Sequence, residues 1–320
     1  MIKTLLLTWP VFLCALSPVF LKESAIPAEP FLIRSPTGEF SARFEYGAGT
    51  SEFIPIAGFQ VFDRSGRSVY VKDDFKHTLF DIADNGRVVG IDFDGPVSGR
   101  AKLHFYDPGG QETGTAQIKF LSARQFSRDG SVYAVLDGMD GLRLFRAAGT
   151  ELYSLGPASG FCLSSDGRSV ALVRDRMIVL YQDGAEIGQI SLETPFVRGL
   201  NMSADGCRLG FIDRKNFYLH DFQTGLKLGH YQEQDPELNF ITLDMNDQGV
   251  ALAGLDRDPG RGKPGRHKRG IVYLLDEQAS IRWQETVDYQ SWDITLPAVE
   301  FTKDNRFQVK NDQAIREYGY

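Results

Sequence analysis

The stretch LNMSADGCRLGFIDRKNFYLHDFQTGLKLGHY, residues 200–231, is the most regular part of the sequence and decides the fold. Apolar residues alternate along four short segments, which polar or glycine-containing links separate. The four predicted strands are Leu200–Ser203, Cys207–Ile212, Asn216–Phe222 and Leu226–Tyr231. In the first link, Gly206 supplies the positive φ that a residue with a Cβ resists. Four strands with three tight reversals form one antiparallel sheet of about 30 residues, the size of one β-propeller blade.

The first turn of this unit recurs along the whole chain. The seven copies end at Gly38, Gly86, Gly130, Gly167, Gly206, Gly249 and Asn305. Their successive spacings are 48, 44, 37, 39, 43 and 56 residues, which bracket the period of about 40–45 residues expected for four-stranded blades. A β-sandwich also has strands at short spacing, but it has no reason to repeat a four-strand phrase seven times. The sequence therefore predicts an all-β, seven-bladed β-propeller of four-stranded antiparallel blades.

The last copy is shorter than the others. It offers strands at Ala298–Phe301, Arg306–Lys310 and Ala314–Tyr320. Propellers join their first and last blades, because an exposed strand edge can pair with another chain and cause aggregation. Two arrangements follow: Leu21–Ala28 closes the last blade as its fourth strand, or that segment is removed and the blade stays three-stranded.

Two phrases of the sequence resemble known repeats. LHDFQTGLKLGHY (219–231) and YLLDEQASIRW (273–283) each carry an acidic residue, a TG-like turn and a closing aromatic residue. In this they resemble the outer hairpin of PQQ-like, quinoprotein-type repeats, and the SxDG turns resemble those of WD40-like repeats in many secreted bacterial propellers. The resemblance covers nearly all of residues 30–320. It implies the blade rather than an activity, because there is no Gly-His…Trp-Asp pairing and the closing tryptophan occurs only at Trp283.

The N-terminus is predicted to be a signal peptide spanning residues 1–25, with cleavage somewhere between residues 21 and 28. Lys3 precedes an apolar run, Leu5–Leu21, and a polar segment follows. Residues 29–320 then form a single propeller domain outside the cytoplasm, either periplasmic or secreted. The alternative is an uncleaved leader that anchors the protein in a membrane, for which the apolar run is just long enough.

Composition excludes several classes of protein. A formal net charge of −7 argues against a nucleic-acid binder, which needs a positive field. Three cysteines are too few for a disulfide framework or a thiolate metal cluster, and Cys162 and Cys207 lie at opposite strand ends, which disfavours a disulfide.

The sequence indicates no catalytic, cofactor-binding or metal-binding residue. His104 and His220 occur in similar segments of two predicted third strands. This predicts that both side chains pack within their blades. The aspartates of the turns, such as Asp129 and Asp205, are expected to cap backbone N–H groups. The two acids of Asp92-Phe93-Asp94 have the spacing that begins a calcium-binding loop. No acid or amide follows at the later ligand positions, so the sequence does not predict a calcium site here.

Long loops cluster on one half of the predicted ring. The links between second and third strands lie on the face opposite the tight turns. The long ones are Tyr46–Ile54, Phe93–Arg100 and Asp256–Arg269, and the connection Thr286–Pro297 lies on the same face. Loops carry function more often than the scaffold beneath them, so this half is the predicted partner surface.

The predicted partner-binding residues lie in these loops. They are Arg257, Arg261, Lys263, Arg266, His267, Lys268, Arg269, Tyr289, Trp292 and Phe53. The basic residues would contact an acidic surface, lipid head groups or polysaccharide; the alternative is a solvated loop. The two aromatic residues Tyr289 and Trp292 would anchor a partner or a sugar, or pack beneath the loop.

The sequence therefore predicts a monomeric extracytoplasmic scaffold that binds a protein of the cell envelope, or an envelope polymer, through these loops. The alternative is a propeller enzyme, a quinoprotein-type dehydrogenase or a lactonase-like hydrolase. Such an enzyme needs acids, amides or histidines in the central channel, whereas the first strands supply mostly Phe, Leu, Met and Ser.

Overall fold

The computed structural model describes residues 31–35, 38–46, 56–73, 77–95, 99–138, 140–236, 238–247, 249–256, 269–288, 298–301, 306–311 and 314–318. Within these ranges every regular element is a β-strand, and the strands form six four-stranded sheets and one three-stranded sheet. All strand pairs are antiparallel, as the register of each sheet shows.

We number the sheets in chain order. Sheet 1 contains β1 (Phe31–Arg34), β2 (Phe40–Tyr46), β3 (Ile56–Asp63) and β4 (Ser68–Lys72). Sheet 2 contains β5 (Leu79–Ile82), β6 (Val88–Phe93), β7 (Ala101–Tyr106) and β8 (Glu112–Ile118). Sheet 3 contains β9 (Leu121–Phe126), β10 (Val132–Asp137), β11 (Gly141–Arg146) and β12 (Glu151–Leu155). Sheet 4 contains β13 (Gly160–Leu163), β14 (Ser169–Arg174), β15 (Met177–Gln182) and β16 (Ala185–Ser191).

Sheet 5 contains β17 (Gly199–Met202), β18 (Arg208–Asp213), β19 (Asn216–Asp221) and β20 (Lys227–Gln232). Sheet 6 contains β21 (Leu238–Met245), β22 (Val250–Asp256), β23 (Arg269–Leu275) and β24 (Ile281–Asp288). Sheet 7 contains β25 (Ala298–Phe301), β26 (Phe307–Asn311) and β27 (Ala314–Tyr318).

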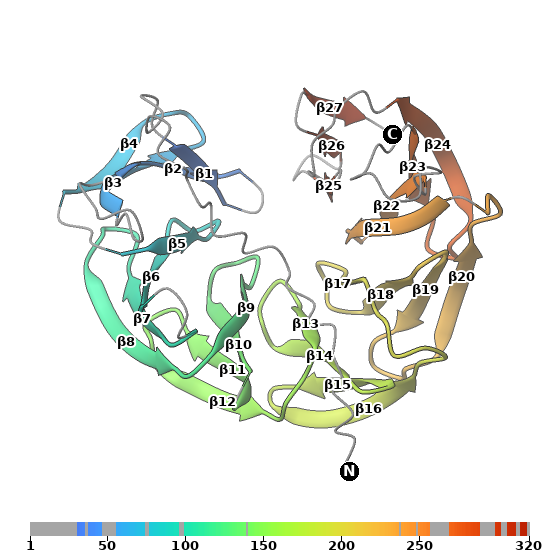
Figure 1. The fold of residues 1–320 in the computed structure, drawn as a ribbon, viewed down its shortest axis with the longest axis horizontal. Coiled ribbons are helices and arrows are strands. Elements are labelled where there is room, and N and C mark those ends of the chain that lie inside the picture. The colour runs from blue at the N-terminus through green and yellow to red at the C-terminus, as the bar shows by residue number, and fades with distance from the viewer. Residues whose placement is uncertain are drawn as a thin grey trace, which may run out of the picture.

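The sheets follow one another around an arc (Figure 1). The first strand of each sheet lies on the inner side of the arc, and the fourth strand of each four-stranded sheet lies on the outer rim. Sheets 1 and 7 are the two ends of the arc, and no described strand pairs one sheet with another. The arrangement is that of a β-propeller-like fold.

The core lies between neighbouring sheets rather than in the middle of the molecule. Six clusters of buried residues fill the six spaces between successive sheets. Between sheets 2 and 3, for example, Phe105 packs edge-on against Tyr133 with ring centroids 6.0 Å apart. Because the second strands β6, β10, β14 and β18 are buried on both faces over most of their length, these sheets bury one face against the sheet before them and the other against the sheet after them.

The turns after the first strands of sheets 3, 4 and 5 have the expected chemistry. In sheet 5, Ser203 Oγ donates to Asp205 Oδ1 over 2.6 Å, and the same oxygen accepts the Cys207 N–H. Gly206 has a φ of +72°. The turns at Asp129 and Asp166 repeat these contacts, so the predicted capping role of the turn aspartates is confirmed.

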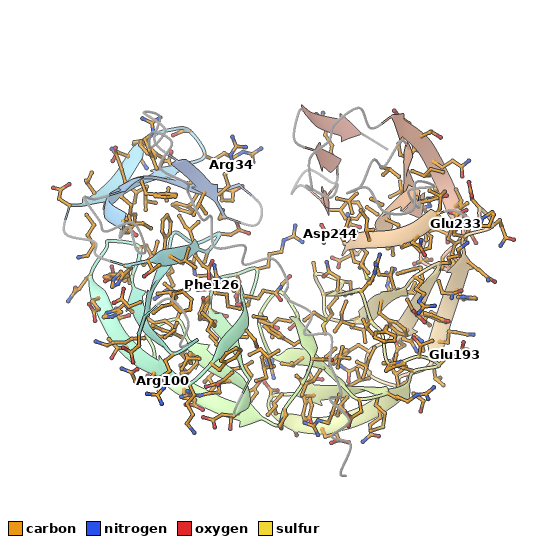
Figure 2. The ribbon with its side chains drawn as sticks, viewed as in Figure 1. Arg34, Arg100, Phe126, Glu193, Glu233 and Asp244 are labelled. Atoms are coloured by element: carbon orange, nitrogen blue, oxygen red, sulfur yellow. The ribbon has the colours of Figure 1, made fainter. Side chains whose placement is uncertain are left out.

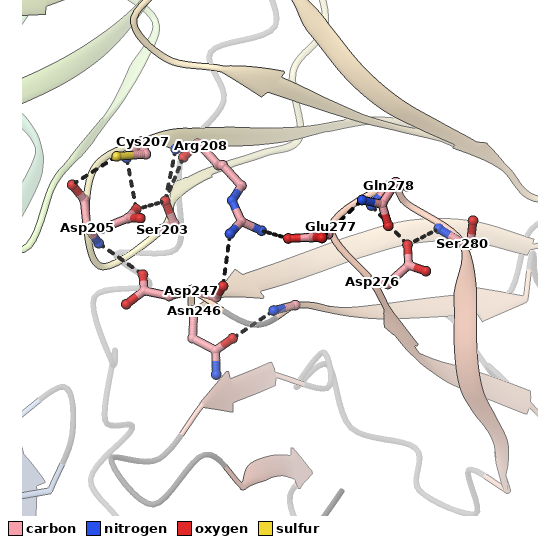
Figure 3. Close-up of polar contacts among 11 residues, drawn as sticks. Ser203, Asp205, Cys207, Arg208, Asn246, Asp247, Asp276, Glu277, Gln278 and Ser280 are labelled. Atoms are coloured by element: carbon pink, nitrogen blue, oxygen red, sulfur yellow. Dashed lines mark hydrogen bonds and ion pairs between the residues drawn. The ribbon is translucent and has the colours of Figure 1, made fainter.

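Polar contacts at these turns also join neighbouring sheets (Figure 3). The Asp205 N–H donates to Asp247 Oδ1 over 3.0 Å, and Arg208 Nη2 donates to the Asp247 carbonyl over 2.9 Å. Arg208 also lies 3.7 Å from a carboxylate oxygen of Glu277. The guanidinium group therefore links sheets 5 and 6 on the face that carries the tight turns.

The strands of sheet 5 begin and end within two residues of their predicted bounds. Cys162 is buried and Cys207 is exposed, and both are free thiols. The predicted leader and the segment Leu21–Ala28 lie outside the described residues. Among the described residues, no helix could span a membrane.

Candidate central binding pocket

A pocket of about 500 Å³ lies among the first strands of all seven sheets. The last residue of each of these strands lines it: Arg34, Ile82, Phe126, Leu163, Met202, Met245 and Phe301. Turn residues such as Arg128 and Ser165 complete the lining, so the pocket lies toward the face that carries the tight turns. Its size is in the range of small-molecule or side-chain binding pockets.

One wall of the pocket contains a half-buried ion pair. Asp81 Oδ2, on β5, accepts a hydrogen bond from Arg124 Nε on β9 and another from the Tyr133 hydroxyl, each over 2.6 Å. Burial lowers the pKa of Arg124, but Asp81 and Tyr133 together outweigh burial and raise it. Burial and the same carboxylate raise the pKa of Tyr133 well above its usual value. Arg124 is therefore held charged and in place by sheet 2.

The opposite wall is organised by Asp244 on β21. Asn201 Nδ2 on β17 donates to Asp244 Oδ1 over 2.8 Å, and the Phe301 N–H on β25 donates to Asp244 Oδ2 over 2.6 Å. One carboxylate thus connects the inner strands of sheets 5, 6 and 7. The side chains of Arg34, Phe126 and Asp244 are labelled on the inner side of the arc in Figure 2.

Two arginines of the lining are not neutralised. Arg34 and Arg128 line the pocket, and neither makes an ion pair within the described part of the chain. The lining thus contains three guanidinium groups and two carboxylates, Asp81 and Asp244, and both carboxylates already accept hydrogen bonds. The arrangement favours an anionic group in the pocket.

Most of the partner surface predicted from sequence cannot be placed. Nine of its residues lie outside the described residues: Arg257, Arg261, Lys263, Arg266, His267, Lys268, Tyr289, Trp292 and Phe53. The backbone of Arg269 begins β23, opposite Asp288 of β24. The long-loop surface stays a prediction.

The polar residues of the pocket are not among those predicted from sequence. The sequence predicts first strands of mostly Phe, Leu, Met and Ser, whereas Asp81, Arg124, Asn201 and Asp244 also line the channel. A signal was nevertheless present. The residue that ends the first strand is apolar in six copies, and the first copy has Arg34 there.

The fold and the pocket define an all-β, propeller-like protein with a polar channel among its inner strands. Comparison with protein-family models and with curated proteins gives no match to this chain.

Proposed function

We propose that this chain is a seven-bladed β-propeller of the WD40-like or PQQ-like type. The support is that one pocket takes a residue from the first strand of every sheet, as a ring around a central axis requires. The six inter-sheet cores support the same arrangement, because each is the contact between two neighbouring blades. Sheet 7 would be the last blade.

The proposed function is an extracytoplasmic binding module, whose partner is an envelope protein that seats an acidic side chain in the central pocket. The observation that carries this function is the pair of guanidinium groups, Arg34 and Arg128, that line the pocket without an ion pair among the described residues. Arginine binds carboxylates with two parallel hydrogen bonds, which gives the contact direction as well as strength. The long-loop half of the opposite face is a second proposed contact for the same partner.

A propeller enzyme acting at the same pocket is the second candidate. It is favoured by Asp81, Asn201 and Asp244, which bring acids and an amide to the channel. However, Asp81 is held by Arg124 and Tyr133, and Asp244 by Asn201 and a backbone N–H. Because both carboxylates are engaged in joining sheets, the geometry supports binding better than acid–base chemistry.

The binding proposal is tested with a fluorescent hexaglutamate peptide at low salt, titrated with the purified protein. Changing both Arg34 and Arg128 to Gln should weaken binding by about 100-fold, since a hydrogen bond to a charged group contributes ~1.5–3 kcal/mol and 1.4 kcal/mol is about tenfold. Arg146→Gln is the matched control, because Arg146 is exposed on the outer part of sheet 3 and does not line the pocket.

Two results would contradict the proposal: no saturable binding by the parent protein, or equal loss in the Arg146→Gln control. A stoichiometric quinone in the purified protein would favour the enzyme instead. The long-loop contact is tested separately by deleting Gly260–Arg269. That deletion should leave peptide binding unchanged while it removes partners from a capture experiment with envelope extract.

A further inference from the structure

A cluster of two imidazoles and one carboxylate lies between sheets 1 and 2, on strands other than those that line the pocket. One nitrogen each from His77 and His104 and one oxygen from Asp92 lie within 4.8 Å of one another. His77 Nδ1 is 2.7 Å from Asp92 Oδ1, and His104 Nε2 is 3.2 Å from Asp92 Oδ2. The two imidazole rings face each other with centroids 4.4 Å apart.

Strand register brings these residues together. Asp92 lies on β6, and His104 on β7 is paired with Gly90, two residues before Asp92 on the same face of the sheet. His77 precedes β5 in the link from sheet 1, and its ring lies against Gly90. A Cβ at position 90 would lie 2.3 Å from His77 Cδ2, so only glycine leaves room for this imidazole.

The glycine is a departure from the repeat. In sheets 3, 4 and 5 the residue that faces the preceding sheet at this place is Val135, Leu172 or Phe211, each buried in a core cluster. In sheet 2 the same place holds Gly90, and a polar cluster around His77 takes the space of the apolar side chain.

The place of Asp92 also recurs, with different partners. Asp137 ends β10, where it accepts the N–H groups of Lys119 and Phe120 from the preceding link. In sheet 2 the Asp92 carboxylate faces two imidazoles. The contact between His77 and Asp92 is enough to hold the link to sheet 2. It does not explain why a second imidazole, that of His104, lies beside the same carboxylate.

The outer nitrogens of both rings are oriented by neighbouring groups. His77 Nε2 lies 2.6 Å from the Tyr106 hydroxyl, and His104 Nδ1 lies 3.2 Å from Glu112 Oε1. Histidines that bind metals use one ring nitrogen for the metal and the other for such a partner. The inner nitrogen of His104 is buried and, although close to Asp92, makes no hydrogen bond in the geometry observed.

We propose that His77, Asp92 and His104 bind a Zn²⁺ ion through His77 Nδ1, the Asp92 carboxylate and His104 Nε2. Two imidazoles and a carboxylate suit a first-row divalent metal ion better than Ca²⁺ or Mg²⁺, which prefer oxygen ligands only. Zn–N and Zn–O bonds of about 2.0–2.1 Å place tetrahedral ligand atoms roughly 3.4 Å apart. The nitrogen–oxygen separations of 2.7 and 3.2 Å are shorter than this, and all three ligand atoms lie within 4.8 Å of one another, so the ligands would move apart slightly to admit the ion. The ion would replace the proton shared with Asp92, and water would complete its coordination, because the Asp92 side chain is 37% exposed.

The bound ion would fasten the link that carries His77 to strands β6 and β7, and so hold sheet 2 to the segment that arrives from sheet 1.

The test uses the tag-free full chain after treatment with EDTA, titrated calorimetrically with ZnCl₂ and spectroscopically with CoCl₂. The expected result is a single equivalent of Zn²⁺ and the intense visible absorption of low-symmetry Co²⁺. Asp92→Asn and His104→Gln preserve side-chain size but each removes or weakens a direct ligand. Loss of a residue that only orients a ligand weakens binding by up to about 100-fold, so each of these variants should weaken Zn²⁺ binding by more than about 100-fold. Glu112→Gln should weaken it by about 10–100-fold.

His230→Gln is the matched control, since His230 is exposed and contacts Asn216 in sheet 5. His77 is not substituted, because it is buried and its loss would disturb the packing on Gly90. Circular dichroism confirms that each variant is folded. The proposal is overturned if the parent binds no equivalent of Zn²⁺, if folded Asp92→Asn and His104→Gln bind as the parent does, or if His230→Gln loses binding.

Discussion

Replacing Tyr133 by Phe tests the polar network in the wall of the central pocket. Tyr133 is fully buried, and its hydroxyl donates to Asp81 Oδ2 over 2.6 Å. Phe keeps the ring contacts with Phe105 and Phe126, so the change removes one hydrogen bond to a charged group and leaves the core filled. Such a bond contributes ~1.5–3 kcal/mol to stability, and we expect the free energy of unfolding to fall by about 2 kcal/mol.

Tyr70 provides the matched comparison. Its hydroxyl is also buried, but it has no hydrogen-bond partner among the described residues. Burial raises the pKa of this tyrosine too, but Tyr70 lacks the hydrogen bond to a carboxylate that Tyr133 makes. Because Tyr70→Phe removes a hydroxyl that was desolvated without compensation, we expect unchanged stability or a gain of up to about 1 kcal/mol.

The assay is urea unfolding of both variants and the parent, followed by fluorescence and circular dichroism. The expected difference is a lower midpoint for Tyr133→Phe with the same slope, because the surface exposed on unfolding does not change. A Tyr133→Phe variant that unfolds at the parent's midpoint would contradict the prediction. An equal loss of stability in Tyr70→Phe would contradict it as well, since the cost would then come from packing rather than from the bond to Asp81.

Two further predictions concern thiols and acid. Exposed Cys207 should react with a thiol reagent in the folded protein, whereas Cys162, whose pKa is raised by burial, should react only on unfolding; equal rates would contradict this. Burial lowers the pKa of His220 in the folded protein, so the unfolded state binds more protons as the pH falls. The contribution of neutral His220 to the free energy of unfolding is therefore complete above about pH 6.5 and is lost as the pH falls below that value. With EDTA present, the urea midpoint should therefore fall from pH 7.5 to 5.5, and fall less in His220→Gln; a midpoint that rises would contradict the sign.

The strands could be predicted because their signals are local. Alternating apolar residues and a Ser-x-Asp-Gly turn fix a hairpin within a dozen residues, and the same contacts recur at Asp129, Asp166 and Asp205. The turn at Gly249 shows the limit of the rule. Its φ is not positive, and a Cβ there would lie 2.7 Å from the Leu275 carbonyl oxygen, so glycine is needed for the close approach of another strand.

The pocket could not be predicted in the same way, because its polar contacts join residues far apart in the sequence. Asp244 meets Phe301, 57 residues later, and Asp81 meets Tyr133, 52 residues later. No local pattern reports such contacts; they depend on which strand ends lie side by side around the arc. Loop length instead predicts a partner surface on the opposite face, and most of that surface lies outside the described residues.

The histidines show how a small error of register hides a site. The similar segments around His104 and His220 predict that the two residues occupy matching positions and that both are packing residues. The register shows that His220, opposite Leu209, corresponds to Tyr106, opposite Val88, because both pairs face the preceding sheet beside the turn.

The true counterpart of His104 in sheet 5 is Tyr218, which stacks on Phe211. Sheet 2 has Gly90 in the place of Phe211, and the space that the missing ring leaves is where His77 lies. One glycine thus turns a stacking position into a place where two imidazoles and a carboxylate meet. A scan for metal ligands at fixed sequence spacing cannot find such a site, but a comparison of equivalent positions across the blades can, because it asks which copy lacks a side chain that the others bury.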